Sequence, residues 1–226
     1  MVKRINWPES YRIIHSRFPF TGIFDRIADP NDLEALLTIE ARTNDRILDE
    51  AGAITLVRPK DRVSGPGTTA IMAAFTHTKP SRFSDGSFGV YYAARRLPTA
   101  VAESQFHTER FYRATNEPSA DIDMRVYAAR ISGVFDDLLT LASSDARLDP
   151  DSYEASQGYA RQIYDADELD GVVYKSVRDD QHRPAVACLR PSVVRNCYSH
   201  SYLLYRWDGT TGRILEIVKR EALGLD

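Results

Sequence analysis

Three observations predict an α+β fold for this chain. Segments with strand character and segments with helical character alternate irregularly, whereas a regularly wound α/β sheet alternates them one by one. The composition, with 43% hydrophobic and 27% charged residues, is that of a folded globular protein. The 226 residues contain no repeats and no low-complexity tracts, and this length suits one domain. We therefore expect a single α+β domain.

The first third of the chain is predicted to place strands around one helix. An extended segment begins at Tyr11, and a helix follows in which Asp29 can cap the first turn and Pro30 fits it. Two apolar runs, residues 53–57 and 70–77, have the length and composition of strands. The glycine-rich sequence between these two runs indicates a turn.

The rest of the chain is predicted to alternate strands with helical segments. Residues 88–94 read as a strand, and residues 97–114 read as a helix with Pro98 in its first turn. Residues 133–143 read as a helix or a turn, and residues 153–165 have helical potential. The remaining strands are expected at residues 121–131, 170–177, 184–191, 201–209 and 213–221.

Several classes of chemistry lack their sequence signatures. The net charge of −3 and the pI near 6.0 provide no overall basic field for holding nucleic acid. Only Cys188 and Cys197 are present, so neither a disulfide framework nor a paired-cysteine zinc site is predicted. The sequence contains no HExxH, GxxxxGK[ST], GxGxxG or GxSxG motif. We therefore expect no metal, and a site made of scattered polar residues.

The hydropathy of the chain predicts no membrane contact. No apolar run approaches the roughly 20 residues that a membrane-spanning helix needs. The opening sequence, residues 1–10, lacks the apolar core of a signal peptide. From both observations we expect a cytoplasmic protein.

A glutamate stands on the expected inner face of the helix at 97–114. Ala100, Glu103, Ser104, His107 and Phe111 share one face at helical spacing, and this face is predicted to dock against the preceding strand. A carboxylate there is costly unless it is paired, hydrogen-bonded or placed where a ligand can reach it. The glutamate therefore needs a partner or a function.

Four polar residues of this region also have ordinary structural interpretations. Glu103 could reach solvent or pair with a neighbouring arginine, and Ser176 could satisfy backbone groups at the end of its strand. Arg82 could be a solvated loop cation, and Tyr92 an aromatic core residue. Taken singly, each of the four is better explained by structure than by function.

Their order along the chain resembles a known family. "RFSDG" begins at Arg82, "YAA" at Tyr92, and "TAVAE" ends at Glu103, which follows the tyrosine by 11 residues. "GVVYKSVR" contains Ser176, and the early "YRI" contains Arg12. These patterns in this order resemble the RES-domain family of bacterial toxins, which is named for an arginine, a glutamate and a serine.

The resemblance implies a fold and a reaction. The implied fold is ADP-ribosyltransferase-like, of the diphtheria-toxin type, with a twisted β-sheet core and flanking helices. Residues 1–226 would form one RES domain with an N-terminal elaboration over about residues 14–69. The implied substrate is NAD⁺, cleaved between nicotinamide and ribose without a metal.

The resemblance also assigns roles to residues. Glu103, Arg82 and Ser176 would be catalytic, with Glu103 stabilising an oxocarbenium-like ribose and Arg82 binding the pyrophosphate. Tyr92 would stack on or position the nicotinamide, and Ser176 would orient Glu103 or the ribose.

A further arginine from the start of the chain is expected at this site. Arg12 would help to bind NAD⁺, but about 70 residues separate it from the "RFSDG" arginine, more than in compact RES domains. The sequence therefore leaves open whether Arg12 or Arg17 joins the site.

The acceptor and the partners remain open at this level. Water would give hydrolysis and phosphate would give phosphorolysis, so both deplete NAD⁺, whereas a protein side chain would give mono-ADP-ribosylation of a host protein. A non-catalytic module that binds a nucleotide or an antitoxin is a further alternative. The resemblance implies an Xre-type helix-turn-helix antitoxin that blocks the site, contact with DNA only through it, and a homo-oligomer or a toxin-antitoxin hetero-oligomer.

Overall fold

The computed structural model describes residues 1–16, 24–26, 51–142 and 144–220. Within them, seven strands form one mixed sheet in the order β1-β2-β5-β4-β3-β6-β7, accompanied by three α-helices. The fold is therefore α+β, as predicted. The strands are β1 (Val2–His15), β2 (Tyr91–Ala94), β3 (Ala120–Asp137), β4 (Gly171–Lys175), β5 (Pro184–Cys188), β6 (Val194–Asp208) and β7 (Arg213–Arg220). The helices are α3 (Thr68–Thr76), α4 (Leu97–Ala114) and α5 (Glu154–Ala166).

Strand β3 organises the sheet because it pairs along both of its edges. One edge pairs antiparallel with β1, and the other pairs antiparallel with β6 and then, at Phe135–Asp137, parallel with β4. Strand β1 also touches β2 at the pair Tyr11 and Ala94. The pairing thus returns on itself, from β1 through β2, β5, β4 and β3 back to β1, while β6 and β7 extend from β3.

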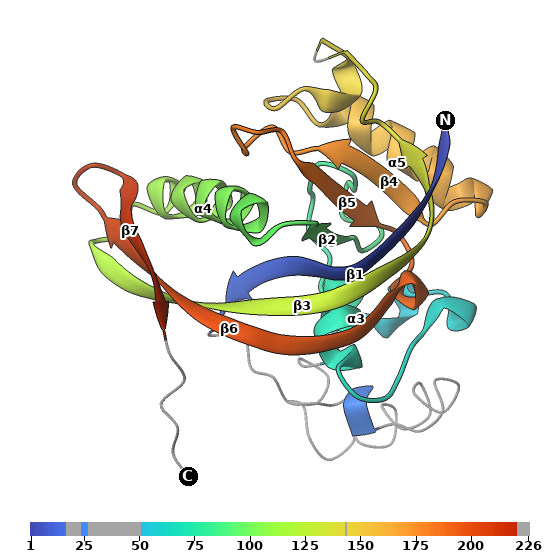
Figure 1. The fold of residues 1–226 in the computed structure, drawn as a ribbon, viewed down its shortest axis with the longest axis horizontal. Coiled ribbons are helices and arrows are strands. Elements are labelled where there is room, and N and C mark those ends of the chain that lie inside the picture. Colours follow the sequence, from blue (N-terminus) through green and yellow to red (C-terminus); the bar gives the residue numbers. More distant parts are fainter. Residues whose placement is uncertain (17–23, 27–50, 143, 221–226) are drawn as a thin grey trace.

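The two faces of β3 are covered by different helices. Side chains alternate between the faces of a strand, so even- and odd-numbered neighbours enter different cores. Figure 1 shows α4 and α3 on opposite sides of the long strands β1, β3 and β6. The side chains that pack with α4 include Ile122, Met124 and Val126 of β3. Those that pack with α3 include Tyr127, Ala129 and Ile131 of β3.

Helix α5 covers the short strands β4 and β5. Ala160 and Ile163 of α5 are buried, and they pack in one cluster with Val172 and Tyr174 of β4. The same cluster includes the buried Phe83, which lies in the segment before β2. This segment, which carries Arg82, is therefore held between α5 and the sheet.

Most elements of the second half lie where the sequence predicts them. Helix α4 spans the predicted residues 97–114, α5 falls on 153–165, and β4, β5 and β7 fall on predicted C-terminal strands. Strand β6 covers the predicted strand at 201–209 but begins earlier, at Val194. Strand β1 begins at Val2, well before the predicted start at Tyr11. The helix predicted to begin at Asp29 lies outside the described residues. Among the residues that are described, no helix is both long and apolar enough to cross a membrane.

Three predicted elements are wrong. Residues 70–77, predicted as a strand, lie largely in α3, which follows Gly67 in a left-handed conformation with φ of 80°. Six of the nine residues of α3 are buried, so the helix lacks the polar stripe that would reveal its period. Residues 53–57, also predicted as a strand, contain a single 3₁₀ turn at Ile54–Leu56. Residues 133–137, predicted as helix or turn, continue β3 because β1 and β4 pair with them.

Candidate active site

Glu103 reaches the site from the middle of α4. One side of the helix packs on the core of β3 and β6 through Leu97, Val101 and Tyr112. On the same side, Ser104 hydrogen-bonds Tyr205 of β6 at 2.6 Å. The neighbouring side of the helix is left to face the short strands. The Glu103 side chain lies on this side and is 24% exposed, so it is shielded but still accessible.

The prediction that Ala100, Glu103, Ser104, His107 and Phe111 dock against the sheet is wrong for the second half of α4. Ala100 is buried, as predicted for that face, but 58% of the His107 side chain and 47% of Phe111 are exposed. The helix packs instead through the stripe that includes Leu97 and Val101. Helix α4 is mostly polar, so the apolar spacing in its sequence is too weak to fix its rotation.

Ser176 holds the Glu103 carboxylate from the end of β4. Its side chain is fully buried, and its Oγ donates a hydrogen bond of 2.5 Å to Glu103 Oε1. The same Oγ accepts the backbone N–H groups of Arg178 at 3.3 Å and Asp179 at 3.1 Å. A hydroxyl has two lone pairs and one proton, so these contacts direct its proton toward the glutamate. The other carboxylate oxygen, Glu103 Oε2, lies 3.8 Å from His107 Nε2, which is too far for a hydrogen bond.

The loop that carries Arg82 is fixed by Tyr92 and α5. The Tyr92 hydroxyl lies 2.9 Å from Ser81 Oγ and accepts the Phe83 N–H at 2.9 Å. Ser156 Oγ of α5 donates to the Arg82 carbonyl at 2.6 Å. Burial raises the pKa of Tyr92 to about 12, so its hydroxyl stays protonated at neutral pH. The loop backbone is therefore rigidly placed.

The guanidinium of Arg82 is incompletely paired. Its Cζ lies 5.2 Å from the centre of the Tyr153 ring, which is a cation–π distance. Its Nη1 is buried and has no hydrogen-bond partner among the described residues. A buried donor without a partner costs free energy, so such a group calls for an explanation. An anionic ligand that supplies the missing acceptor would provide one.

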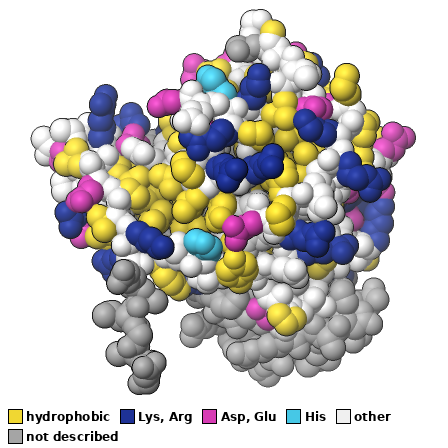
Figure 2. Space-filling model, in the orientation of Figure 1, with side chains coloured by type: hydrophobic (Ala, Val, Ile, Leu, Met, Phe, Trp, Pro, Cys, Tyr) yellow, Lys and Arg dark blue, Asp and Glu magenta, His cyan; other side chains and the backbone are white. Residues whose placement is uncertain are grey.

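Positive charge surrounds the glutamate. The pKa of His107 is lowered, first by desolvation, which is partial because much of the ring is exposed, and then by Arg178, Arg110 and Arg82. Glu103 acts on this pKa in the opposite direction. In Figure 2, Lys and Arg side chains gather in the middle of the face seen there, between α4 and β5. A carboxylate set among arginines suits a substrate that has both an anionic part and a cationic part.

The predicted site residues come together from distant parts of the sequence. Burial raises the pKa of Tyr174, a buried residue of β4, well above the ordinary tyrosine value. Glu103 and Tyr92 raise this pKa further and Arg82 lowers it, so all three act on one hydroxyl. With the Ser176 hydrogen bond, the structure thus groups the four main predicted residues.

The fifth predicted residue, Arg12, reaches this group through the backbone of β2. Its Nη1 donates to the Tyr92 carbonyl at 3.3 Å, and its Cζ lies 4.9 Å from the centre of the Tyr91 ring. Tyr91 belongs to the core on the α3 side of the sheet. Arg12 therefore braces the strand that bears Tyr92. Arg17 lies outside the described residues.

Sequence reasoning missed several residues that shape the site. Arg178 and Asp179 lie two and three residues after Ser176, and their N–H groups on its hydroxyl form a serine turn that the spacing S-x-x-D could have suggested. His107 lies one helical turn after Glu103 and could have been paired with it. Tyr153, the residue just before α5, faces Arg82, and Ser156 of α5 bonds the loop that carries Arg82. Neither had a local sequence signal.

Two comparisons place the chain among known proteins. The RES domain, as a family, matches residues 58–208, which is more than half of the chain and includes Arg82, Tyr92, Glu103 and Ser176. An uncharacterized protein of Sinorhizobium fredii, y4oC, is 28% identical over 207 residues. That similarity covers 89% of this chain and 84% of the relative.

Proposed function

Because the chain belongs to the RES-domain family, we propose that it is an NAD⁺-consuming enzyme that breaks the bond between nicotinamide and ribose. The observation that carries the proposal is the state of two side chains. One carboxylate oxygen of Glu103 accepts a hydrogen bond from Ser176, and the other lies too far from His107 for a hydrogen bond. Arg82 has a buried nitrogen, Nη1, that finds no hydrogen-bond partner in the described part of the chain. A dinucleotide with a cationic ring and a pyrophosphate would supply a positive charge near Glu103 and a hydrogen-bond acceptor for Arg82.

The reaction needs a fixed negative charge more than an acid. Nicotinamide departs as a neutral molecule because its ring nitrogen, already positive, takes the electron pair of the breaking C1′–N bond. The ribose carbon becomes electron-poor, much as a sugar does during glycoside cleavage. Glu103 would stabilise this oxocarbenium character and accept a hydrogen bond from a ribose hydroxyl. The acceptor then bonds to C1′ and loses its proton.

The other residues would bind and orient the substrate. Arg82 would donate its planar fork to the pyrophosphate, because a guanidinium stays charged and bonds phosphate oxygens in pairs. Tyr92 would position the nicotinamide and, through Ser81 and Phe83, the loop that carries Arg82. Arg12 would contribute to binding through the Tyr92 carbonyl.

We place hydrolysis or phosphorolysis first among the outcomes, so that the enzyme depletes NAD⁺. The exposed His107 lies one helical turn from Glu103, and its lowered pKa keeps it neutral and able to take a proton from an attacking acceptor. Mono-ADP-ribosylation of a host protein is the alternative outcome. As part of the same proposal, we assign the seven-stranded sheet to the ADP-ribosyltransferase-like fold.

A chain that destroys a shared cofactor has to be restrained in its own cell. We propose that it is the toxin of a toxin-antitoxin pair in the cytoplasm. An Xre-type helix-turn-helix antitoxin would cover the site and provide the contact with DNA. Expression of the chain alone should halt growth, and co-expression with the product of a neighbouring helix-turn-helix gene should restore it.

The direct test is nicotinamide release from NAD⁺ by the purified full chain. The reaction would be run in a phosphate-free buffer, with added phosphate, and with added cell extract, and products would be identified by mass. We expect nicotinamide together with ADP-ribose or its 1-phosphate. Release only with extract, accompanied by ADP-ribose on a protein, would select the alternative outcome. NAD⁺ that is bound but intact in all three mixtures would make the chain a binding module.

A further inference from the structure

Helix α4 and the turn after β4 are joined by two hydrogen bonds that run in opposite directions. Ser176 Oγ donates to Glu103 Oε1 at 2.5 Å, and Thr99 Oγ1 donates to Asp179 Oδ2 at 2.6 Å. On the helix, Thr99 and Glu103 are four residues apart and share one face. On the turn, Ser176 and Asp179 are three residues apart. The contacts therefore form two neighbouring rungs between the same two segments.

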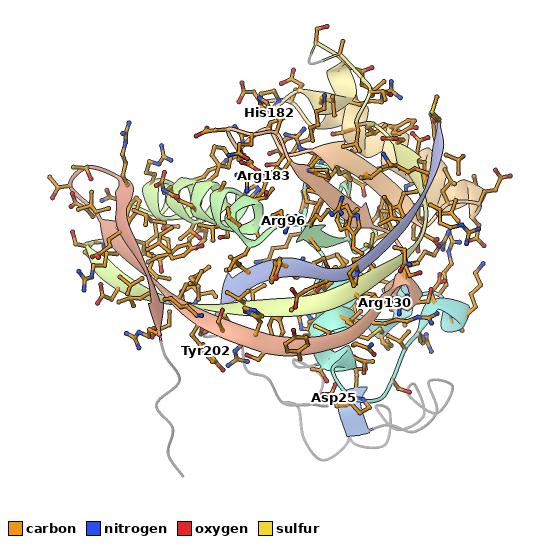
Figure 3. All side chains as sticks on the ribbon, viewed as in Figure 1. Asp25, Arg96, Arg130, His182, Arg183 and Tyr202 are labelled. Atoms are coloured by element: carbon orange, nitrogen blue, oxygen red, sulfur yellow. The ribbon has the colours of Figure 1, made fainter. Side chains whose placement is uncertain are left out.

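The second rung is deeper and more saturated than the first. Asp179 is 5% exposed and Thr99 is fully buried. The Asp179 carboxylate also accepts the Gln181 N–H at 3.2 Å and lies 3.1 Å from Arg183 Nε. Burial alone would raise the pKa of Asp179, but the hydrogen bonds from Thr99 and Gln181 and the positive charge of Arg183 outweigh it and lower the pKa. Figure 3 shows Arg183 between α4 and the start of β5.

The first rung depends on the second through the backbone of the turn. The N–H of Asp179 donates to Ser176 Oγ, so the position of Asp179 helps to decide where the serine proton points. The Asp179 side chain ties this turn to the first helical turn of α4, where a negative charge also meets the favourable end of the helix dipole. If the Thr99 contact were lost, the turn could shift relative to Glu103 without any change in Ser176 itself.

We propose that Thr99 and Asp179 are positioning residues that set the geometry between Ser176 and the Glu103 carboxylate. Neither residue has to touch the substrate. The inference rests on the proposed function of Glu103 for its consequence in catalysis, but the geometry itself can be observed without any reaction. A displacement of about 1 Å at a reacting group can cost on the order of 10²-fold in rate, so a partial shift should be measurable.

The test compares two substitutions at one buried position. Thr99→Val keeps the size of the side chain and removes the hydroxyl, whereas Thr99→Ser keeps the hydroxyl and removes a methyl group. We expect kcat for nicotinamide release to fall about tenfold in Thr99→Val with little change in KM, and to stay near the wild-type value in Thr99→Ser. A purely structural role would lower the melting temperature in both variants and leave kcat of the folded protein unchanged, which would overturn the proposal.

A second readout keeps the inference separate from the proposed function. The proton resonance of the Ser176 hydroxyl, identified by its loss in Ser176→Ala, should be protected from exchange in the wild type and in Thr99→Ser. It should exchange faster or disappear in Thr99→Val. An unchanged resonance in Thr99→Val would refute positioning whatever the activity. If the wild-type protein released no nicotinamide but the Ser176 hydroxyl proton exchanged as expected in the variants, the proposed function would be refuted and the positioning role supported.

Discussion

Two arginines of this protein, Arg190 and Arg82, differ in how completely the described residues pair their guanidinium groups. Arg190 is 4% exposed, and its guanidinium contacts Asp61 at 2.9 Å, Asp167, and the Tyr164 carbonyl at 3.3 Å. Arg82 has a guanidinium stacked at 5.2 Å on Tyr153 and a buried Nη1 with no partner among the described residues.

The two arginines differ in which ion pairs and hydrogen bonds the surrounding residues provide. Around Arg190 the protein supplies both countercharges, and these join the 58–61 segment to the end of α5. Around Arg82 the described residues supply a hydrogen-bonded backbone and an aromatic face but leave the Nη1 donor without an acceptor. Removal of the first should therefore damage the fold, whereas removal of the second should damage only binding.

The largest expected effect is on stability at Arg190. The Arg190→Met variant leaves the buried Asp61 carboxylate without its countercharge. Breaking a buried ion pair from one side typically costs about 3–5 kcal/mol. Urea unfolding should show a loss of this size, whereas the matched Arg82→Met variant should unfold within about 0.5 kcal/mol of the wild type. Equal losses in both variants would erase the distinction between the two arginines.

The complementary effect is on ligand binding at Arg82. A hydrogen bond to a charged group contributes about 1.5–3 kcal/mol, so Arg82→Met should weaken ADP-ribose binding by about 10–100-fold. Calorimetric titration of folded Arg82→Met against the wild type measures this change. Unaltered affinity would mean that the unpaired nitrogen does not meet the pyrophosphate.

The loop that carries Arg82 offers a smaller test. Tyr92→Phe removes the hydroxyl that accepts the Phe83 N–H and bonds Ser81, so a buried donor is left without a partner. This should lower the free energy of unfolding by about 1–3 kcal/mol and also weaken ADP-ribose binding, because the loop is no longer fixed. Lost stability with full affinity would show that loop rigidity does not matter for binding.

The smallest effect is a dependence on pH at His107. Its pKa in the folded protein is below the unfolded value of about 6.5, so the unfolded chain binds the proton more readily. Stability should therefore fall as pH drops through about 6.5, and His107→Gln should remove this part of the slope. Unfolding curves of both proteins between pH 7.5 and 5 provide the comparison. Identical slopes would mean that desolvation and the surrounding arginines do not disfavour the charged form of this ring.

The elements that the sequence predicted well are those with local signals. Helix α4 matches its predicted bounds because Pro98 marks its first turn and the 18 residues of Leu97–Ala114 are compatible with a helix. The end of β3 was missed because its strand character comes from pairing with β1 and β4, which are distant in sequence. Helix α3 was taken for a strand because a short, largely buried helix shows no polar stripe.

The site divides in the same way. The resemblance could name Arg82, Tyr92, Glu103 and Ser176 because they fall in short ordered patterns, and the structure brings them together. It implied that Ser176 would orient Glu103 or the ribose, but it could not decide between the two, since Ser176 and Glu103 are 73 positions apart. It also could not reveal the Thr99–Asp179 contact across 80 positions. Such contacts depend on how α4 is rotated, which its weak apolar pattern does not fix.

The charge of Glu103 is the centre of the account, and one comparison tests it most directly. Glu103→Gln and Glu109→Gln place the same substitution on one helix. Glu109 pairs with Arg113 and accepts the Ile214 N–H, away from Ser176. With both variants folded, nicotinamide release from NAD⁺ should fall about 10²-fold or more in Glu103→Gln and stay near the wild-type rate in Glu109→Gln. A Glu103→Gln protein that releases nicotinamide at the wild-type rate would contradict the account.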